Sequence, residues 1–232
     1  MTSQFHRNLN RMTLFTALVA VGLMLFWRPF MEIAISNIYL NGIIIGATLF
    51  GIGLTFVEIF KLLPEYKWLH GFTGGRRWNR LPPRLLRPVA IMLARGGTYL
   101  SPNTVQGFLE MVMVRFEDAR ESVRYITNTL IFLGLLGTFW GLIMTVGGFA
   151  ELIGGLNFDD ETVLLAMQQG LSRPLAGMAM AFTSSLLGLA GSLIVGFLGL
   201  QVQLAQNAIF RELEDYLATR AVVTDTADSA KK

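Results

Sequence analysis

Long stretches without charge constrain this chain more than any other feature of its sequence. The longest extends from Pro174 to Phe210, 37 residues without Asp, Glu, Lys, Arg or His. As a helix it would measure about 55 Å, whereas the hydrocarbon core of a membrane is about 30 Å thick. Three further apolar runs cover Met12 to Trp27, Ile33 to Val57 and Tyr125 to Ala150. The sequence therefore predicts an all-α integral membrane protein with four transmembrane helices.

The first apolar run is the shortest and also has features of a signal peptide. Arg7 and Arg11 precede it, as in a secretory leader. The sequence at its end, Trp27-Arg28-Pro29-Phe30, is not a small-residue cleavage site, and a second apolar run follows at once. We expect a retained membrane helix.

Composition agrees with a membrane protein and gives no sign of a cofactor. Charged residues make up only 15% of the chain, against about 25% in soluble domains. The net charge is +3, but most basic residues flank apolar runs, which argues against a nucleic-acid partner. The chain has no cysteine, and neither His6 nor His70 has a ligand neighbour at metal spacing. We expect no metal or other cofactor.

The basic residues predict the orientation of the four spans. Eleven Lys and Arg residues lie between the second and third spans, and others precede the first span and follow the fourth. Only Arg28 and Arg173 fall on the other side. By the positive-inside rule both termini and the central loop are cytoplasmic. A tight turn at 28–37 and a longer connection at 151–173 are then external.

The chain is expected to divide into four segments. Residues 1–64 form a two-helix membrane hairpin, and 65–101 an irregular basic cytoplasmic segment rich in Gly, Pro and Arg. Residues 102–220 hold spans three and four with long cytoplasmic helical extensions, beginning with Ser101 as N-cap and Pro102 as first helical residue. Residues 221–232 form a disordered tail.

Small and hydroxylated residues gather in the last two spans. Span three carries Gly134, Gly137 and Gly141 together with Thr138 and Thr145. Glycines four residues apart let helix backbones approach closely, so they indicate helix packing. The two threonines are seven residues apart and share one helix face. Such a stripe could line an ion pathway, although a threonine hydroxyl can also bond to its own helix.

Span four repeats the pattern with Thr183, Ser184 and Gly188. No Asp, Glu, Lys, Arg or His lies in the middle of any span, because Glu58 and Lys61 are at the cytoplasmic end of span two. The chain alone supplies no membrane carboxylate to carry a proton. If it conducts protons, another polypeptide must provide the titrating group.

Residues 134–142, Gly-Leu-Leu-Gly-Thr-Phe-Trp-Gly-Leu, resemble the MotA/TolQ/ExbB proton-channel family, whose members are stator or energiser subunits of the bacterial inner membrane. A second match covers Pro174 through Gly188, and the whole likeness extends from about Arg115 to Leu217. The resemblance implies a homopentamer around two copies of a single-span partner similar to MotB, TolR or ExbD. That partner would carry the membrane aspartate.

The resemblance also implies roles for individual residues. Thr138 and Thr183 match the family's threonines in these two spans and would face the partner aspartate. The hydroxyl and small-residue patterns themselves, rather than the resemblance, lead us to expect that Thr145 and Ser184 extend the ion pathway and that Gly134, Gly137, Gly141 and Gly188 pack the helices at the pore. Met178 stands where TolQ and ExbB carry a glutamate, so the subfamily stays open.

A membrane enzyme and a non-conducting scaffold are the two alternatives to a motor subunit. A membrane enzyme would need a base or metal beside a nucleophile, and the spans offer hydroxyls without either, so no enzymatic activity is expected. A non-conducting scaffold or assembly subunit would need only the packing glycines. Hydroxyl-lined walls suit protons or sodium, and the process energised stays open. Membrane lipids surround the spans in every case.

Overall fold

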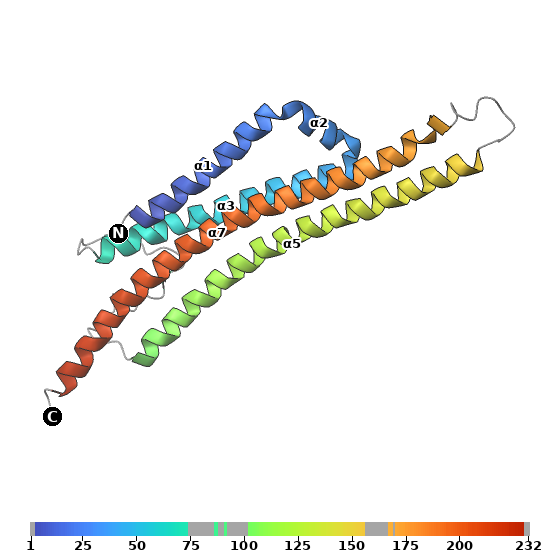
Figure 1. Ribbon diagram of the computed structural model, residues 1–232. Helices are drawn as coiled ribbons and strands as arrows, with labels where there is room; N and C mark the ends of the chain where they lie inside the picture. Colours follow the sequence, from blue (N-terminus) through green and yellow to red (C-terminus); the bar gives the residue numbers. More distant parts are fainter. Residues whose placement is uncertain are drawn as a thin grey trace. The chain divides into compact units, whose positions relative to one another are not determined.

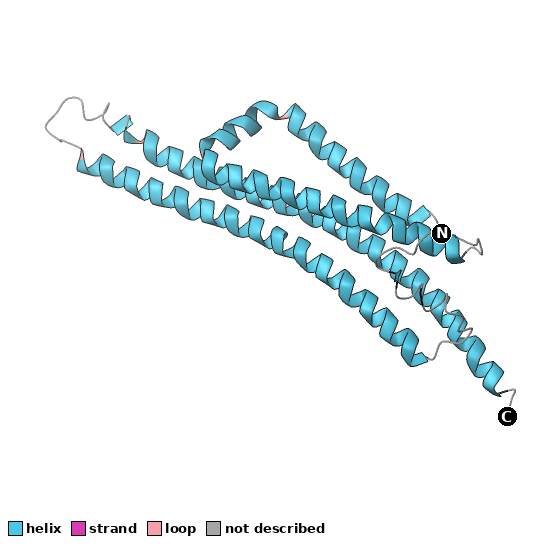
Figure 2. Ribbon diagram, turned by 180° about the vertical axis from the view of Figure 1, so that it is seen from behind, coloured by secondary structure: helices cyan, strands magenta, loops and turns pink. Residues whose placement is uncertain are grey.

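In the computed structural model of the chain, the described residues are 3–73, 86–87, 91, 102–155, 167–168 and 170–229. They form five helices: α1 (Ser3–Leu25), α2 (Trp27–Ser36), α3 (Ile38–Thr73), α5 (Pro102–Gly154) and α7 (Ser172–Ser229) (Figure 1). These ranges contain no strand (Figure 2). The all-α prediction is confirmed for this part of the chain.

Three of the helices, α3, α5 and α7, are long and apolar enough to cross a membrane. A fourth crossing exists if α1 and α2 count as one broken span, since the pair passes the same test together with a bend of 83° between them. These helices are those of a multi-pass membrane protein.

The connection between α1 and α3 differs from the tight turn expected at 28–37. Trp27–Ser36 is a ten-residue helix, α2. At its end Asn37 adopts an extended backbone, and its side-chain Oδ1 accepts a hydrogen bond from the backbone N–H of Leu40 at 3.2 Å. This is an N-cap, because it satisfies one of the N–H groups that the first turn of a helix leaves open. Asn37 therefore begins α3.

Helix α3 continues to Thr73, so the irregular structure expected from residue 65 does not begin there. Pro64 lies inside the helix and is exposed. The helix continues past it because one side remains apolar at helical spacing, with Ile59, Leu62, Tyr66 and Leu69 all buried. Most of the remaining segment, including Ser101 with its expected N-cap role, lies outside the described residues.

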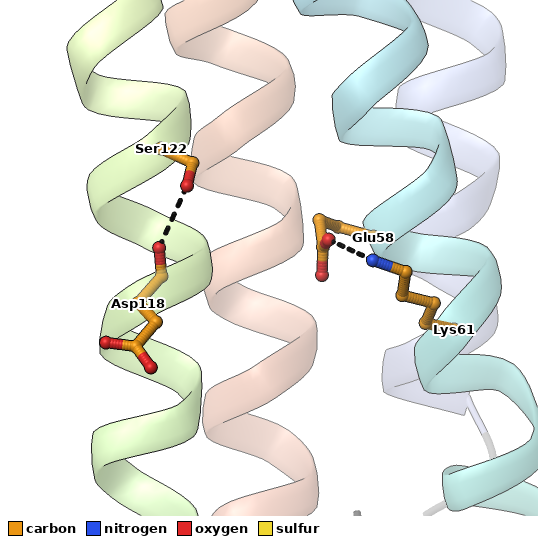
Figure 3. Close-up of polar contacts among 4 residues, drawn as sticks. All are labelled: Glu58, Lys61, Asp118 and Ser122. Carbon is orange, nitrogen blue, oxygen red and sulfur yellow. Dashed lines mark hydrogen bonds and ion pairs between the residues drawn. The ribbon is translucent and has the colours of Figure 1, made fainter. Parts of the chain in front are cut away.

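The first charges after the apolar part of α3 neutralise one another within the helix. Lys61 Nζ lies 2.7 Å from Glu58 Oε1, one turn away (Figure 3). On α5, Ser122 donates a hydrogen bond of 3.1 Å to the carbonyl of Asp118, also within its own helix. The Glu58–Lys61 pair marks the end of the uncharged part of α3, whereas on α5 the uncharged part begins after Arg124.

The helices α5 and α7 extend well past their apolar segments. Pro102 is the first residue of α5, as expected, and one continuous helix leads from it through the third apolar run. Helix α7 has 58 residues, about 87 Å at 1.5 Å per residue. It continues to Ser229, into the segment 221–232 for which the sequence predicted disorder.

The chain divides into two compact units, and α3, α5 and α7 contribute to both. Unit 1 comprises Met1–Leu14, Leu54–Val123 and Leu198–Lys232, and unit 2 comprises Phe15–Gly53 and Arg124–Phe197. Unit 1 has an apolar core drawn from its three long helix segments, with the α5 and α7 contributions being Val105, Val112, Phe116, Val202, Ile209, Leu213 and Leu217. Unit 2 contains all of the expected pathway and packing residues.

Candidate ion-pathway residues in unit 2

The centre of unit 2 is a close contact between α5 and α7, which lie side by side in both views (Figures 1 and 2). Gly134 meets Gly188, Gly141 lies against both Gly177 and Ala181, and Gly148 meets Pro174. Positions farther along α5 thus meet positions earlier in α7. The two helices therefore pair in antiparallel orientation.

Glycine is required at these contacts because the backbones nearly touch. A Cβ added at Gly141 would lie 2.5 Å from the carbonyl oxygen of Gly177, and one at Gly188 would lie 2.6 Å from the carbonyl oxygen of Leu130. Real Cβ atoms do not come this close to backbone. The structure places Gly134, Gly137, Gly141 and Gly188, the four expected packing residues, in this contact.

Helix α3 packs against the same pair and runs parallel to α7. Asn41 bonds to Ser184, and Thr48 and Gly51 meet α7 two and about three turns farther on, at Gly191 and Val195. Gly137 contacts Leu40 as well as Ser184, so all three helices meet at this level.

At the start of α3, four polar side chains form what we call the hydroxyl–amide cluster: Ser36, Asn41, Thr183 and Ser184. Ser184 Oγ donates to Asn41 Oδ1 at 2.8 Å. Asn41 Nδ2 donates to the carbonyl of Ile33 at 2.7 Å and to Ser36 Oγ at 3.2 Å. Ser36 Oγ and Thr183 Oγ1 are 3.2 Å apart. The cluster thus joins α2, α3 and α7 through uncharged groups.

The hydroxyl–amide cluster extends from the surface of the chain into its interior. Asn41 and Ser184 are fully buried, whereas Thr183 is half-buried and Ser36 is exposed. The Thr183 hydroxyl can donate to the carbonyl of Met180, 3.0 Å away in its own helix, or to Ser36. A hydroxyl with two acceptors in reach can rotate its hydrogen from one acceptor to the other. A side chain that contacts an ion or water in passage needs this freedom.

Thr138 makes different contacts from Thr183. Its hydroxyl donates to the carbonyl of Leu135 in its own helix at 2.6 Å, and its side chain is half-buried. Thr183, by contrast, contacts α2 through Ser36. Within the described part of one chain the two threonines are not hydrogen-bonded to each other.

Thr145 is buried between α5 and α7, unlike Thr138. Its hydroxyl lies 2.8 Å from the carbonyl oxygen of Gly141 and 3.3 Å from that of Pro174. It therefore connects the end of α5 to the start of α7. Ser184 is equally enclosed, so these two expected pathway residues lie within the helix contact and only Thr138 and Thr183 are partly accessible.

Asn41 and Ser36 were not predicted from the sequence. A signal for Asn41 was present, because an amide in the middle of an apolar run is costly in a membrane unless it finds partners. Ser36 gave no signal, since a serine beside the expected turn is unremarkable and its contact with Thr183 depends on how α2 joins α3 and how α3 packs on α7.

Met178 is half-buried on α7, where the family likeness would place a glutamate. The described residues contain no group of three or more His, Cys, Asp or Glu able to hold a metal ion.

Comparisons of the chain with protein-family models, with curated proteins and with solved structures found no match.

Proposed function

We propose that this chain is the pore-forming subunit of an ion-driven stator or energiser complex in a bacterial inner membrane, of the MotA/TolQ/ExbB type. The observation that supports it is the hydroxyl–amide cluster, in which Thr183 is one of four uncharged polar side chains gathered within apolar helices. Polar groups inside membrane segments are costly, and they characteristically mark ion pathways.

The ion carrier in this proposal comes from a second polypeptide. The helices of unit 2 offer hydroxyls and an amide, but no carboxylate in mid-span. A single-span partner with a membrane aspartate, in two copies, supplies the group that takes and releases a proton. The hydroxyls of Thr138 and Thr183 hydrate that carboxylate and accept or donate hydrogen bonds as it changes charge.

Assembly as a homopentamer is part of the same proposal. Thr138 and Thr183 are not hydrogen-bonded to each other within one chain, and in the proposed complex each copy places its own α5 and α7 at the shared pore. The α5–α7 contact gives each copy a rigid pair of helices, because two backbones packed this closely cannot easily slide past one another. Both termini are cytoplasmic in this arrangement.

Ion flux in liposomes tests the proposal. The chain is purified together with a candidate partner, a single-span protein encoded by an adjacent gene, and native mass spectrometry counts the subunits of the complex. The wild type is then compared with Thr138→Val and Thr183→Val. Each change removes a hydroxyl with little change in shape, so we expect the five-to-two complex to assemble and its proton flux to fall by about tenfold or more. Sodium replaces the proton gradient in a parallel assay that separates the two ions.

Two matched controls use threonines outside the expected pathway. Thr129→Val on α5 and Thr48→Val on α3 remove hydroxyls that bond to their own helices at 2.8 Å. Both variants should conduct like the wild type. A chain that takes up no partner and conducts no ion, with or without the threonines, is instead a membrane scaffold, the function that the packing glycines alone would serve.

A further inference from the structure

Asn41 differs from every other side chain of the hydroxyl–amide cluster because it connects the rest. It is fully buried, and α3 is otherwise strongly apolar at this level. Its amide contacts Ser184 on α7, Ser36 at the end of α2 and the carbonyl of Ile33. Thr183, which itself lies on α7, reaches α2 only through Ser36.

Three hydrogen bonds hold the side-chain amide of Asn41. Both N–H groups donate, to Ile33 and Ser36, and the oxygen accepts from Ser184. An amide cannot exchange its donor and acceptor ends without rotating, and rotation would break all three bonds. Ser36 is therefore held as an acceptor towards Asn41, and Ser184 as a donor.

The hydrogen bonds of Asn41 extend to Thr183 through Ser36. Ser36 Oγ accepts from Asn41 and donates to the carbonyl of Ile33 at 2.7 Å, so Asn41 and Ile33 together hold the serine that Thr183 contacts. Ser184, the next residue on α7, is held directly. We propose that Asn41 is a positioning residue for the ion pathway, helping to set the place of the Thr183 hydroxyl. This inference rests on the proposed function.

Replacement by aspartate gives a test that a purely structural residue would not pass. The protonated carboxyl of Asn41→Asp keeps the shape, can accept from Ser184 and can donate one hydrogen bond, whereas the ionised form only accepts. Ionisation would remove the donor that position 41 provides to Ser36 and to the carbonyl of Ile33, whose remaining side-chain donor is Ser36 Oγ at 2.7 Å. Acid protonates the introduced carboxyl and base ionises it, so a pH series samples both forms.

We therefore expect the flux of Asn41→Asp relative to wild type to be high in acid and to fall as pH rises. Proton flux is measured on the purified complex in liposomes across a pH series, with wild type, Asn41→Leu and Thr48→Val in parallel. Asn41→Leu should lose about tenfold in flux at every pH while still assembling. Thr48→Val, two turns along the same helix and in contact with the same neighbour, should match wild type throughout.

The outcomes separate this inference from the proposed function. A wild-type complex without flux removes the proposed function and this inference with it. A conducting wild type whose Asn41→Asp variant follows the wild-type pH profile overturns the positioning role alone. If Asn41→Leu does not assemble, Asn41→Asp decides: a pH-dependent flux supports positioning, and a complex that falls apart as pH rises shows that Asn41 only holds the helices together.

Discussion

At the scale of single residues, unit 2 is held by contacts that allow almost no change in size. Gly141 lies against both Gly177 and Ala181, and a side chain there would overlap backbone atoms at 2.5 and 2.6 Å. Gly147, six residues later on the same helix, has no atom of another element within 4 Å of an added Cβ. The two positions form a natural pair for measuring what close packing contributes.

We expect Gly141→Ala to destabilise the bundle by about 1–3 kcal/mol, because overpacking forces the backbones apart. Gly147→Ala should change stability by less than about 0.5 kcal/mol, as surface substitutions usually do. Unfolding by increasing denaturant in detergent micelles, followed by circular dichroism, measures both. Equal stability of the two variants would show that α5 and α7 do not meet at Gly141.

At the scale of elements, the register between helices is the main structural result. Helix α7 pairs with α5 in antiparallel and with α3 in parallel orientation. The chain has no cysteine, so introduced pairs can test both contacts without a background. An added Cβ at Gly199 would lie 3.7 Å from Val123 Cβ in unit 1, and one at Gly191 would lie 3.4 Å from Thr48 Cβ in unit 2.

These separations are close to the Cβ–Cβ distance of a disulfide, about 3.5–4.5 Å. We expect the double variants Val123→Cys with Gly199→Cys, and Thr48→Cys with Gly191→Cys, to form disulfides within one chain on mild oxidation. Mobility on non-reducing gels and mass spectrometry of the linked peptides detect them. The pair Val114→Cys with Gly199→Cys, displaced by more than two turns of α5, should remain reduced within the monomer.

At the scale of the whole molecule, the basic residues predict which ends of the helices are cytoplasmic. Gly107 and Gly154 lie near opposite ends of α5. At either position, an added Cβ would have no atom of the described residues within 4 Å apart from the neighbouring backbone of α5 itself. Cysteine should be tolerated at both. They therefore report on opposite sides of the membrane with equal freedom to react.

We expect a membrane-impermeant maleimide to label Gly154→Cys on intact spheroplasts and to label Gly107→Cys only after the membrane is opened. The excess of Lys and Arg at the Gly107 end is the physical reason, because positively charged loops stay in the cytoplasm. The reverse labelling pattern would show that the topology is inverted, with the Gly107 end of α5 outside and the Gly154 end in the cytoplasm.

The sequence by itself determined the helical class, the long uncharged segments and the start of α5 at Pro102. It also picked out the four glycines, because apolar runs, helix caps and small-residue spacing act locally along the chain. The continuation of α3 through Pro64 to Thr73 was missed, although its apolar spacing was present, because the many Gly, Pro and Arg residues of the segment from residue 65 predicted irregular structure throughout.

Only the tertiary structure decided which hydroxyls are enclosed and which are accessible. Thr145 and Ser184 lie inside helix contacts, and Thr138 and Thr183 do not, although all four look alike in the sequence. The hydroxyl–amide cluster depends on the junction between α2 and α3 and on the register of α3 with α7. It joins side chains up to 147 residues apart, Ser36 and Thr183, and no local pattern encodes such a contact.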